Sequence, residues 1–592
     1  MASSKWLLWF ERGWRWLLHA GFLLLCLRFL VAATRETYPD VLPMLVLTAG
    51  GLGLSVWRPG AALFAFTASV PLLNGLGYVG LAGCPSPLSV VFSAIFLGFS
   101  LKEAQKGANE LWRGRQDEFG RKKAQEAQRE EAQGADPEVT GQGQRAESGG
   151  TDSRSCRATE AGEPSVLSDR WTVVTVERYP TVQLAADVLI TVVLASLVMQ
   201  IARHHDATGF WTPFCRQPVF SYGDPLYFMT SAFVWLQGLF FFRMLSAKGT
   251  EERGNEGARD KGEEQGALSK ERSAGGEAVS AWAKPVFVVY GCTLAAFYLF
   301  QLCLHIPEPI DTTTYCSPLE DIHSFGSIAV AVFAFAIASW RRQSWARTLI
   351  YGIGVIALLT LVVASYSRAT WLAGALVLLL VAWIRLPKKW TAALVGLGVI
   401  AVVIINANAG RETWNRNPYL WRLISLARVE NLANKSPDRF NLYYKTVGMI
   451  REHPFVGHGI GSIYLTSVRF ARPGDPYADI PNFTHNFLLQ MAAELGVPAA
   501  ALFAALIGCA LHRGYRRWKI EDRRANAEAI RSPVSGIRYH EHAMLGVTMA
   551  LVAYLITQMT ANALNIYISN QFFFWFLMAA VLSFNTESAE AE

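Results

Sequence analysis

Residues 349–406 read LIYGIGVIALLTLVVA, then SYSRAT, then WLAGALVLLLVAWI, then RLPKK, then WTAALVGLGVIAVVIIN. Three apolar runs are thus separated by two short polar turns. Similar runs recur along the 592 residues, of which 52% are hydrophobic and 17% charged. They are too long and too uniformly apolar for barrel strands, and backbone groups in lipid must be bonded within helices or closed barrels. The sequence therefore predicts an all-α fold, a polytopic transmembrane helical bundle of about 12–14 spans.

Basic residues gather in alternate short loops of this arrangement. Arg341 and Arg342 stand before one outward span, and Lys388 and Lys389 follow the returning one. Arg and Lys in short loops mark the cytoplasmic side, so we expect both termini there. The net charge of +7 is attributed to membrane topology rather than to a nucleic-acid partner. The eight Cys include no C-x-x-C pair, which argues against a thioredoxin-like or zinc site.

Composition divides the chain into membrane blocks and polar inserts. The segments 102–181 and 246–284 are rich in Gly, Glu, Arg and Lys and poor in aliphatic residues. Such segments bury too little apolar surface to offset the entropy of ordering, so both are predicted to be disordered cytoplasmic inserts. Transmembrane helices are expected over 1–101, 182–245, 285–407 and 485–584, with a large outer loop over 408–484 and a cytoplasmic tail over 585–592. Within the last block, 487–511 reads as one span.

The outer loop contains a predicted amphipathic helix. Ser436 supplies a capping hydroxyl, Pro437 suits the first helical position, Asp438 places an acid in the first turn, and Pro454 ends the helix. One apolar face, which would lie on the bundle or on the lipid headgroups, is expected from the residues at helical spacing, Phe440, Tyr443, Val447 and Ile450.

A glycine-rich turn follows this helix, at residues 453–462. Gly457, Gly459 and Gly461 could present backbone N–H groups to phosphate oxygens. They neither follow a strand nor open an evident helix, so a Rossmann or P-loop interpretation fails its context test.

Three side chains in and beside the loop carry candidate chemistry. His485 opens an apolar helix, where an imidazole of near-neutral pKa can accept a proton; a packed interfacial histidine is the alternative. Arg368 lies in a short outer turn, where it either anchors the helix or binds an anion. Glu494 lies about 13 Å along the helix from His485 and is expected to pair with an arginine of another helix.

The motifs, taken together, resemble one family. They read S-Y-S-R-A-T-W-L at 365–372, E-H-P-F-V-G-H-G-I-G at 452–461, and T-H-N-F-L-L-Q at 484–490 followed by E-L-G at 494–496. With Arg439, this order is similar to that of the O-antigen ligase family. Its superfamily also includes Wzy-type polymerases and membrane protein oligosaccharyltransferases. The resemblance covers about residues 349–584.

The resemblance implies a glycosyltransferase of the bacterial inner (cytoplasmic) membrane, with 408–484 as its periplasmic catalytic loop. It would transfer a glycan from undecaprenyl diphosphate to a lipid A-core or other glycan acceptor. His485 matches the family's essential histidine. Arg368 and Arg439 match arginines that engage the lipid-linked diphosphate, and Arg422 is a further candidate. The expected partners are these substrates and membrane lipid, with no nucleic acid.

Expectations about the reaction follow from the charges. Guanidinium groups can stabilise a departing diphosphate without a metal, and the sequence shows no carboxylate pair to hold a catalytic cation. A metal-independent, inverting transfer without a cofactor is therefore expected. The motifs leave open a Wzy-type O-antigen or exopolysaccharide polymerase and a protein O-oligosaccharyltransferase. A lipid-linked sugar transporter is a further alternative, although it would not need a histidine base.

Overall fold

The computed structural model describes residues 2–35, 41–79, 87–134, 180–208, 224, 226–247, 282–299, 322–340, 344–408, 420, 424, 437–472, 483–531, 543–561 and 563–582. In these parts all regular secondary structure is helical, which confirms the predicted all-α class. The chain divides into two units, Met1–Gly98 with Thr181–Glu592 and, separately, Phe99–Pro180.

The helices of the N-terminal half are long, with few breaks inside them. They are α1 (Ala2–Arg35), α2 (Val41–Trp57), α3 (Pro59–Val79), α4 (Pro87–Gly134), α6 (Pro180–Thr208), α8 (Tyr227–Ala247) and a helix over Trp282–Leu299.

The helices of the C-terminal half include several short ones near the loop. They are α10 (Ile322–Ser339), α11 (Trp345–Ala364), α12 (Arg368–Arg385), α13 (Lys388–Asn408), α17 (Pro437–Glu452), α18 (Ile463–Thr466), the 3-10 turn η2 (Ser467–Phe470), α19 (Phe487–Leu495), α20 (Val497–Arg531), α21 (Ala543–Ala561), α22 (Ala563–Ile566) and α23 (Ile568–Leu582).

Ten helices in the described residues are long and apolar enough to cross a membrane, and three shorter apolar helices accompany them. The predicted 12–14 spans correspond to the ten long helices and the three shorter apolar helices taken together. The protein is accordingly a multi-pass membrane protein. Helices such as α2, α3 and α8 carry apolar residues all around, as expected for helices surrounded by lipid and by each other.

The core of the bundle is built around α23, in which every residue is buried. Two of its polar side chains accept hydrogen bonds inside the protein: Tyr554 of α21 donates to Asn570 Oδ1 at 2.9 Å, and Trp575 donates to Gln571 Oε1 at 2.9 Å. α8 packs closely against α23, because Gly238 leaves room for the Trp575 ring. Buried polar groups that are satisfied in this way fix one packing arrangement.

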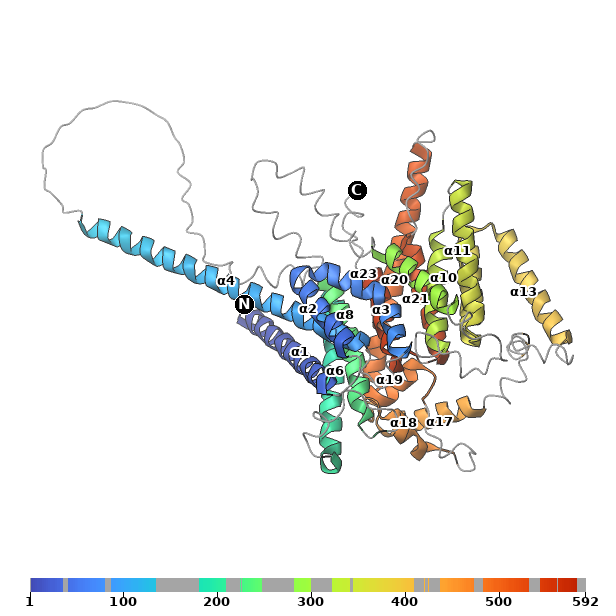
Figure 1. Ribbon diagram of the computed structural model, residues 1–592, viewed down its shortest axis with the longest axis horizontal. Coiled ribbons are helices and arrows are strands. Elements are labelled where there is room, and N and C mark those ends of the chain that lie inside the picture. Colours follow the sequence, from blue (N-terminus) through green and yellow to red (C-terminus); the bar gives the residue numbers. More distant parts are fainter. Residues whose placement is uncertain are drawn as a thin grey trace. The chain divides into compact units, whose positions relative to one another are not determined.

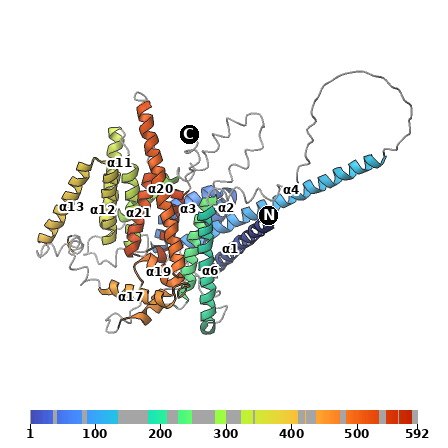
Figure 2. The ribbon, with the colours of Figure 1, turned by 180° about the vertical axis from the view of Figure 1, so that it is seen from behind.

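A second group of helices forms around α10. This helix packs against α11, α12 and especially α21. α11, α12 and α13 are joined by short turns and therefore alternate in direction. The α11–α12 turn and the end of α13 share the end of the bundle at which α17, α18 and α19 lie (Figure 1), and Figure 2 shows the same arrangement from behind.

The prediction of one span over 487–511 is wrong. The helix breaks at Gly496, whose φ is 90°, and continues as α20. Val497 donates its backbone N–H to Pro454 O at 2.8 Å instead of continuing the ladder of α19. The left-handed glycine and Pro498 together end one helix and begin the next, so only α20 is long enough to cross a membrane.

The prediction of disorder over 102–181 is wrong for residues 102–134, because α4 continues from its apolar part to Gly134. Ala, Gln, Glu, Lys and Arg are strong helix formers, so a segment with few large aliphatic residues can still be helical. Residues 135–179 and 248–281 lie outside the described residues.

Candidate active site

The chain between α17 and α18 forms a tight glycine-rich turn. Pro454 cannot continue α17, because proline lacks the backbone N–H that a helix interior requires. Gly457, Gly459 and Gly461 then adopt φ values of 66°, 103° and 72°. Other residues enter this region at a steric cost, so the spacing G-H-G-I-G encodes the turn.

The same three glycines let the turn approach three helices. A Cβ atom would lie 2.3 Å from Glu494 O at Gly457, 2.1 Å from Gln200 Nε2 at Gly459, and 2.7 Å from Phe228 Cα at Gly461. These neighbours belong to α19, α6 and α8. The motif therefore joins the loop to elements that are distant in the sequence.

Backbone N–H groups of the turn are used within the protein. Gly457 donates to His453 O, His458 to Ala493 O, Gly459 to Glu494 O, and Ile460 to Ser196 Oγ, at 2.8 to 3.0 Å. These donors are not available to a phosphate. The hypothesis that the glycines cradle phosphate oxygens is therefore wrong, because their role is packing.

Glu494 lies beneath this turn and is 3% exposed. It accepts from the backbone N–H groups of Gly461 and Ile463 and from Gln490 Nε2 at 3.1 Å. Burial raises the pKa of its carboxyl to about 7, against the lowering effect of these donors. The prediction that Glu494 pairs with an arginine is wrong within the described residues, because no ion pair there includes Glu494. Its oxygens accept from backbone N–H groups and from Gln490 instead.

His485 lies immediately before α19, with a φ of 53°. Its neighbours hold it there. Thr484 is buried with its Oγ1 3.0 Å from Thr446 Oγ1 of α17, and Asn486 caps α19 by accepting from Leu488 N and Leu489 N at 3.1 Å. A left-handed backbone at a residue other than glycine is strained, and such strain clusters at functional sites.

Arg368 begins α12 and is half-buried. The preceding Ser367 caps the helix by accepting from Thr370 N, and Tyr366 is left-handed with a φ of 53°. Tyr366 and His485 are the two non-glycine residues with positive φ among those that the structure describes. The positive end of the α12 dipole adds to the charge of Arg368, and both favour an anion.

α17 carries Arg439 in its first turn, half-buried. The predicted apolar face is not the one that this helix buries most deeply: Phe440 is 61% exposed, Ile450 packs in part against the core, and the buried residues are Leu442, Lys445, Thr446 and Met449. The reason is that α17 packs against α19 and η2 through this other face, which an isolated helical pattern does not define. Arg422 lies outside the described residues.

The structure links these candidates through shared helices. Thr446 joins α17 to the residue before His485, and α21 packs against both α12 and α19. Arg368, Arg439 and His485 thus belong to elements that pack together within one bundle.

The sequence analysis did not single out His323, which the structure places next to a candidate. It lies in the first turn of α10, with its Nδ1 3.4 Å from the Oγ of Ser367, the residue that caps α12. No motif surrounds His323, and only the packing of α10 against α12 brings it beside Ser367, the residue before Arg368.

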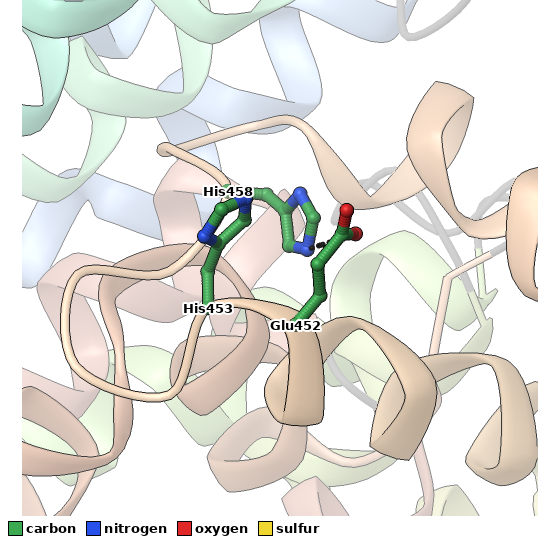
Figure 3. Close-up of side chains that lie close together, drawn as sticks. All are labelled: Glu452, His453 and His458. Carbon is green, nitrogen blue, oxygen red and sulfur yellow. Dashed lines mark ion pairs between the residues drawn. The ribbon is translucent and has the colours of Figure 1, made fainter.

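One group of described side chains has the composition of a metal site. Glu452, His453 and His458 offer ligand atoms that all lie within 4.8 Å of one another (Figure 3). Burial lowers the pKa of the His458 imidazole.

Comparison with known families gives a match over part of the chain. Residues 353–504 match the family model described as O-antigen ligase. This range contains α12, α17 and α19, and with them Arg368, Arg439 and His485. Comparison with curated proteins gives no match. Over residues 353–504, the chain is therefore similar to the O-antigen ligase family.

Proposed function

We propose that the protein is a glycosyltransferase of the bacterial inner membrane. It transfers a glycan from undecaprenyl diphosphate to a lipid A-core acceptor on the periplasmic side. The similarity of residues 353–504 to the O-antigen ligase family supports the class of reaction. The observation that carries the assignment is His485, a histidine with a strained backbone that lies between the Thr446–Thr484 contact and the cap of α19.

In this proposal His485 accepts the proton of the acceptor hydroxyl. The hydroxyl oxygen attacks the anomeric carbon, and the bond to the diphosphate breaks on the opposite face, so the configuration inverts. Assistance by a general base typically contributes about 10² to 10⁴ in rate. The left-handed backbone and the helix cap fix the imidazole and limit the entropy lost when it reaches the proton.

Arg368 and Arg439, with Arg422 as a further candidate, bind the diphosphate. Negative charge grows on the leaving group as the glycosidic bond breaks, and fixed guanidinium groups stabilise that charge. The first turn of α12 supplies further positive potential beside Arg368. The activated bond is already present in the donor, so the transfer uses neither a nucleoside triphosphate nor a catalytic metal ion.

A polymerase that joins repeat units, or a protein O-oligosaccharyltransferase, would use the same donor chemistry. The acceptor distinguishes the three. Purified protein is incubated with undecaprenyl diphosphate glycan, in EDTA and without ATP, and with lipid A-core, donor repeat units or an acceptor protein in separate reactions. Product on lipid A-core supports the ligase, whereas elongation of the donor chain or glycosylation of the protein would replace that part of the proposal.

The variant that tests the base is His485→Asn. Asn tolerates the left-handed backbone better than most residues, so this change removes the base and preserves the turn. We expect transfer to fall by about 10² to 10⁴ while donor binding persists. His512→Asn changes an exposed histidine of α20 and is the matched control. Near wild-type transfer by a correctly folded His485→Asn protein would refute the role of His485, and donor movement without any transfer would favour a transporter.

A further inference from the structure

The end of α17 and the glycine-rich turn bring two imidazoles and one carboxylate together. Glu452 is the last residue of α17, His453 follows it, and His458 returns from the turn. Figure 3 shows the His458 imidazole between the side chains of Glu452 and His453. His458 Nε2 lies 3.6 Å from Glu452 Oε2, and the two imidazole centroids are 4.7 Å apart.

These side chains have the chemistry that zinc prefers. Imidazole nitrogens and a carboxylate oxygen bind Zn²⁺ at about 2.0 to 2.2 Å, which places ligand atoms of a tetrahedral site about 3.4 Å apart. The three ligand atoms lie within 4.8 Å of one another, so small side-chain rotations are enough to reach this spacing. Glu452 is half-exposed and can rotate at little cost.

His458 is held in place before any ion arrives. Its backbone N–H donates to Ala493 O at 2.9 Å, and its carbonyl accepts from Arg203 Nη1 at 2.8 Å and Gln200 Nε2 at 3.2 Å. Phe470 packs against its ring at 5.6 Å between centroids. A ligand fixed by such surrounding contacts loses little freedom on binding a metal.

One existing bond would change. His458 Nε2 lies 3.1 Å from Met449 O, and since a carbonyl only accepts, this nitrogen donates there. An ion bound at Nε2 would displace that proton. Met449 O also accepts the backbone N–H of His453 at 3.1 Å, so it keeps a partner and no buried group is orphaned.

We propose that Glu452, His453 and His458 form a binding site for a divalent transition-metal ion, with Zn²⁺ as the best chemical match. The half-exposed Glu452 opens the site to solvent, which leaves the fourth position for water. The bound ion ties the end of α17 to the turn that packs on α6, α8 and α19. Its role is to stabilise the loop, separately from the transfer reaction, and the site does not depend on the proposed function.

Metal binding is measured directly on the untagged full-length protein in detergent, stripped with EDTA and then dialysed. Co²⁺ is titrated by its visible absorption, and Zn²⁺ is then added in competition. We expect saturable binding of one ion per chain and loss of the cobalt absorption when Zn²⁺ displaces it. Glu452→Gln and His453→Gln should each weaken binding by about 100-fold, whereas His512→Gln should bind like the wild type.

Thermal unfolding gives a second readout. Zn²⁺ should raise the unfolding temperature of the wild type and of His512→Gln, but not that of Glu452→Gln. Size-exclusion elution and circular dichroism of the metal-free proteins check that the variants fold. Absence of saturable binding, or equal binding by the wild type and both ligand variants, would overturn the proposal. Transfer assayed in EDTA reports on the proposed function independently of this result.

Discussion

At the residue scale, backbone strain marks the candidate site. Tyr366 and His485 hold φ values near 53°, and each lies within two residues of a cap that starts a helix, Ser367 for α12 and Asn486 for α19. A strained residue persists when its surroundings over-determine it. The caps supply that constraint, so the strain positions Arg368 and His485 at helix starts.

Glu494, in α19 outside the long spans, makes stability depend on pH. Its folded-state pKa is raised from 4.5 to about 7 by burial, so the folded protein binds this proton more tightly than the unfolded chain does. The contribution of this proton to the stability of the folded protein is complete below about pH 4.5 and is lost as the pH rises through about 7. The shift corresponds to a free energy on the order of 3 kcal/mol.

Glu494→Gln tests this dependence, because its amide stays neutral at every pH. We expect the unfolding temperature of the variant to fall less than that of the wild type between about pH 5 and about pH 8. Other titrating groups are common to both proteins and cancel in the comparison. Parallel pH profiles of the two proteins would show that Glu494 does not titrate in this range.

At the element scale, helix caps provide a matched pair of serines. Ser367 is buried and accepts from Thr370 N at the start of α12, whereas Ser344 at the start of α11 makes no capping bond through its side chain. Removing a functional cap costs about 1 kcal/mol. Ser367→Ala should therefore lower the unfolding temperature more than Ser344→Ala.

The same pair separates stability from substrate binding. Ser367→Ala loosens the turn that holds Arg368 and removes the hydroxyl beside His323, so donor binding should weaken. Ser344→Ala should bind the donor like the wild type. Donor affinity is measured for both variants at a temperature below their unfolding temperatures. Equal affinities would argue that the α12 cap does not position Arg368.

At the scale of the whole molecule, the bundle and the long insert are separate units. Residues Phe99–Pro180 form their own unit, apart from the one that contains α12, α17 and α19. Deleting residues 102–163 should therefore leave transfer activity largely intact. Removing the base at His485, by contrast, should lower transfer by about 100-fold or more. Transfer by the purified, correctly inserted deletion protein is the measurement. Complete inactivity would show that the insert contributes to catalysis.

The amino-acid sequence by itself determined the helical membrane class. Long apolar runs permit only helices in lipid, since every backbone group must find its partner within its own segment. Local chemistry also defined both ends of one helix: Pro437 opens α17, and Pro454 comes two residues after its last residue. These signals depend on neighbouring residues and need no knowledge of distant ones.

Only the tertiary structure decided which groups the glycines and Glu494 contact and which face of α17 is buried. Gly457 contacts α19, Gly459 contacts α6, and the buried face of α17 is the one that meets α19 and η2. The physical reason is that a backbone donor or a buried carboxylate takes whichever partner the packing brings near. Those partners lie far away in the sequence, so a pattern along the chain can indicate a turn or a charge but cannot identify what it contacts.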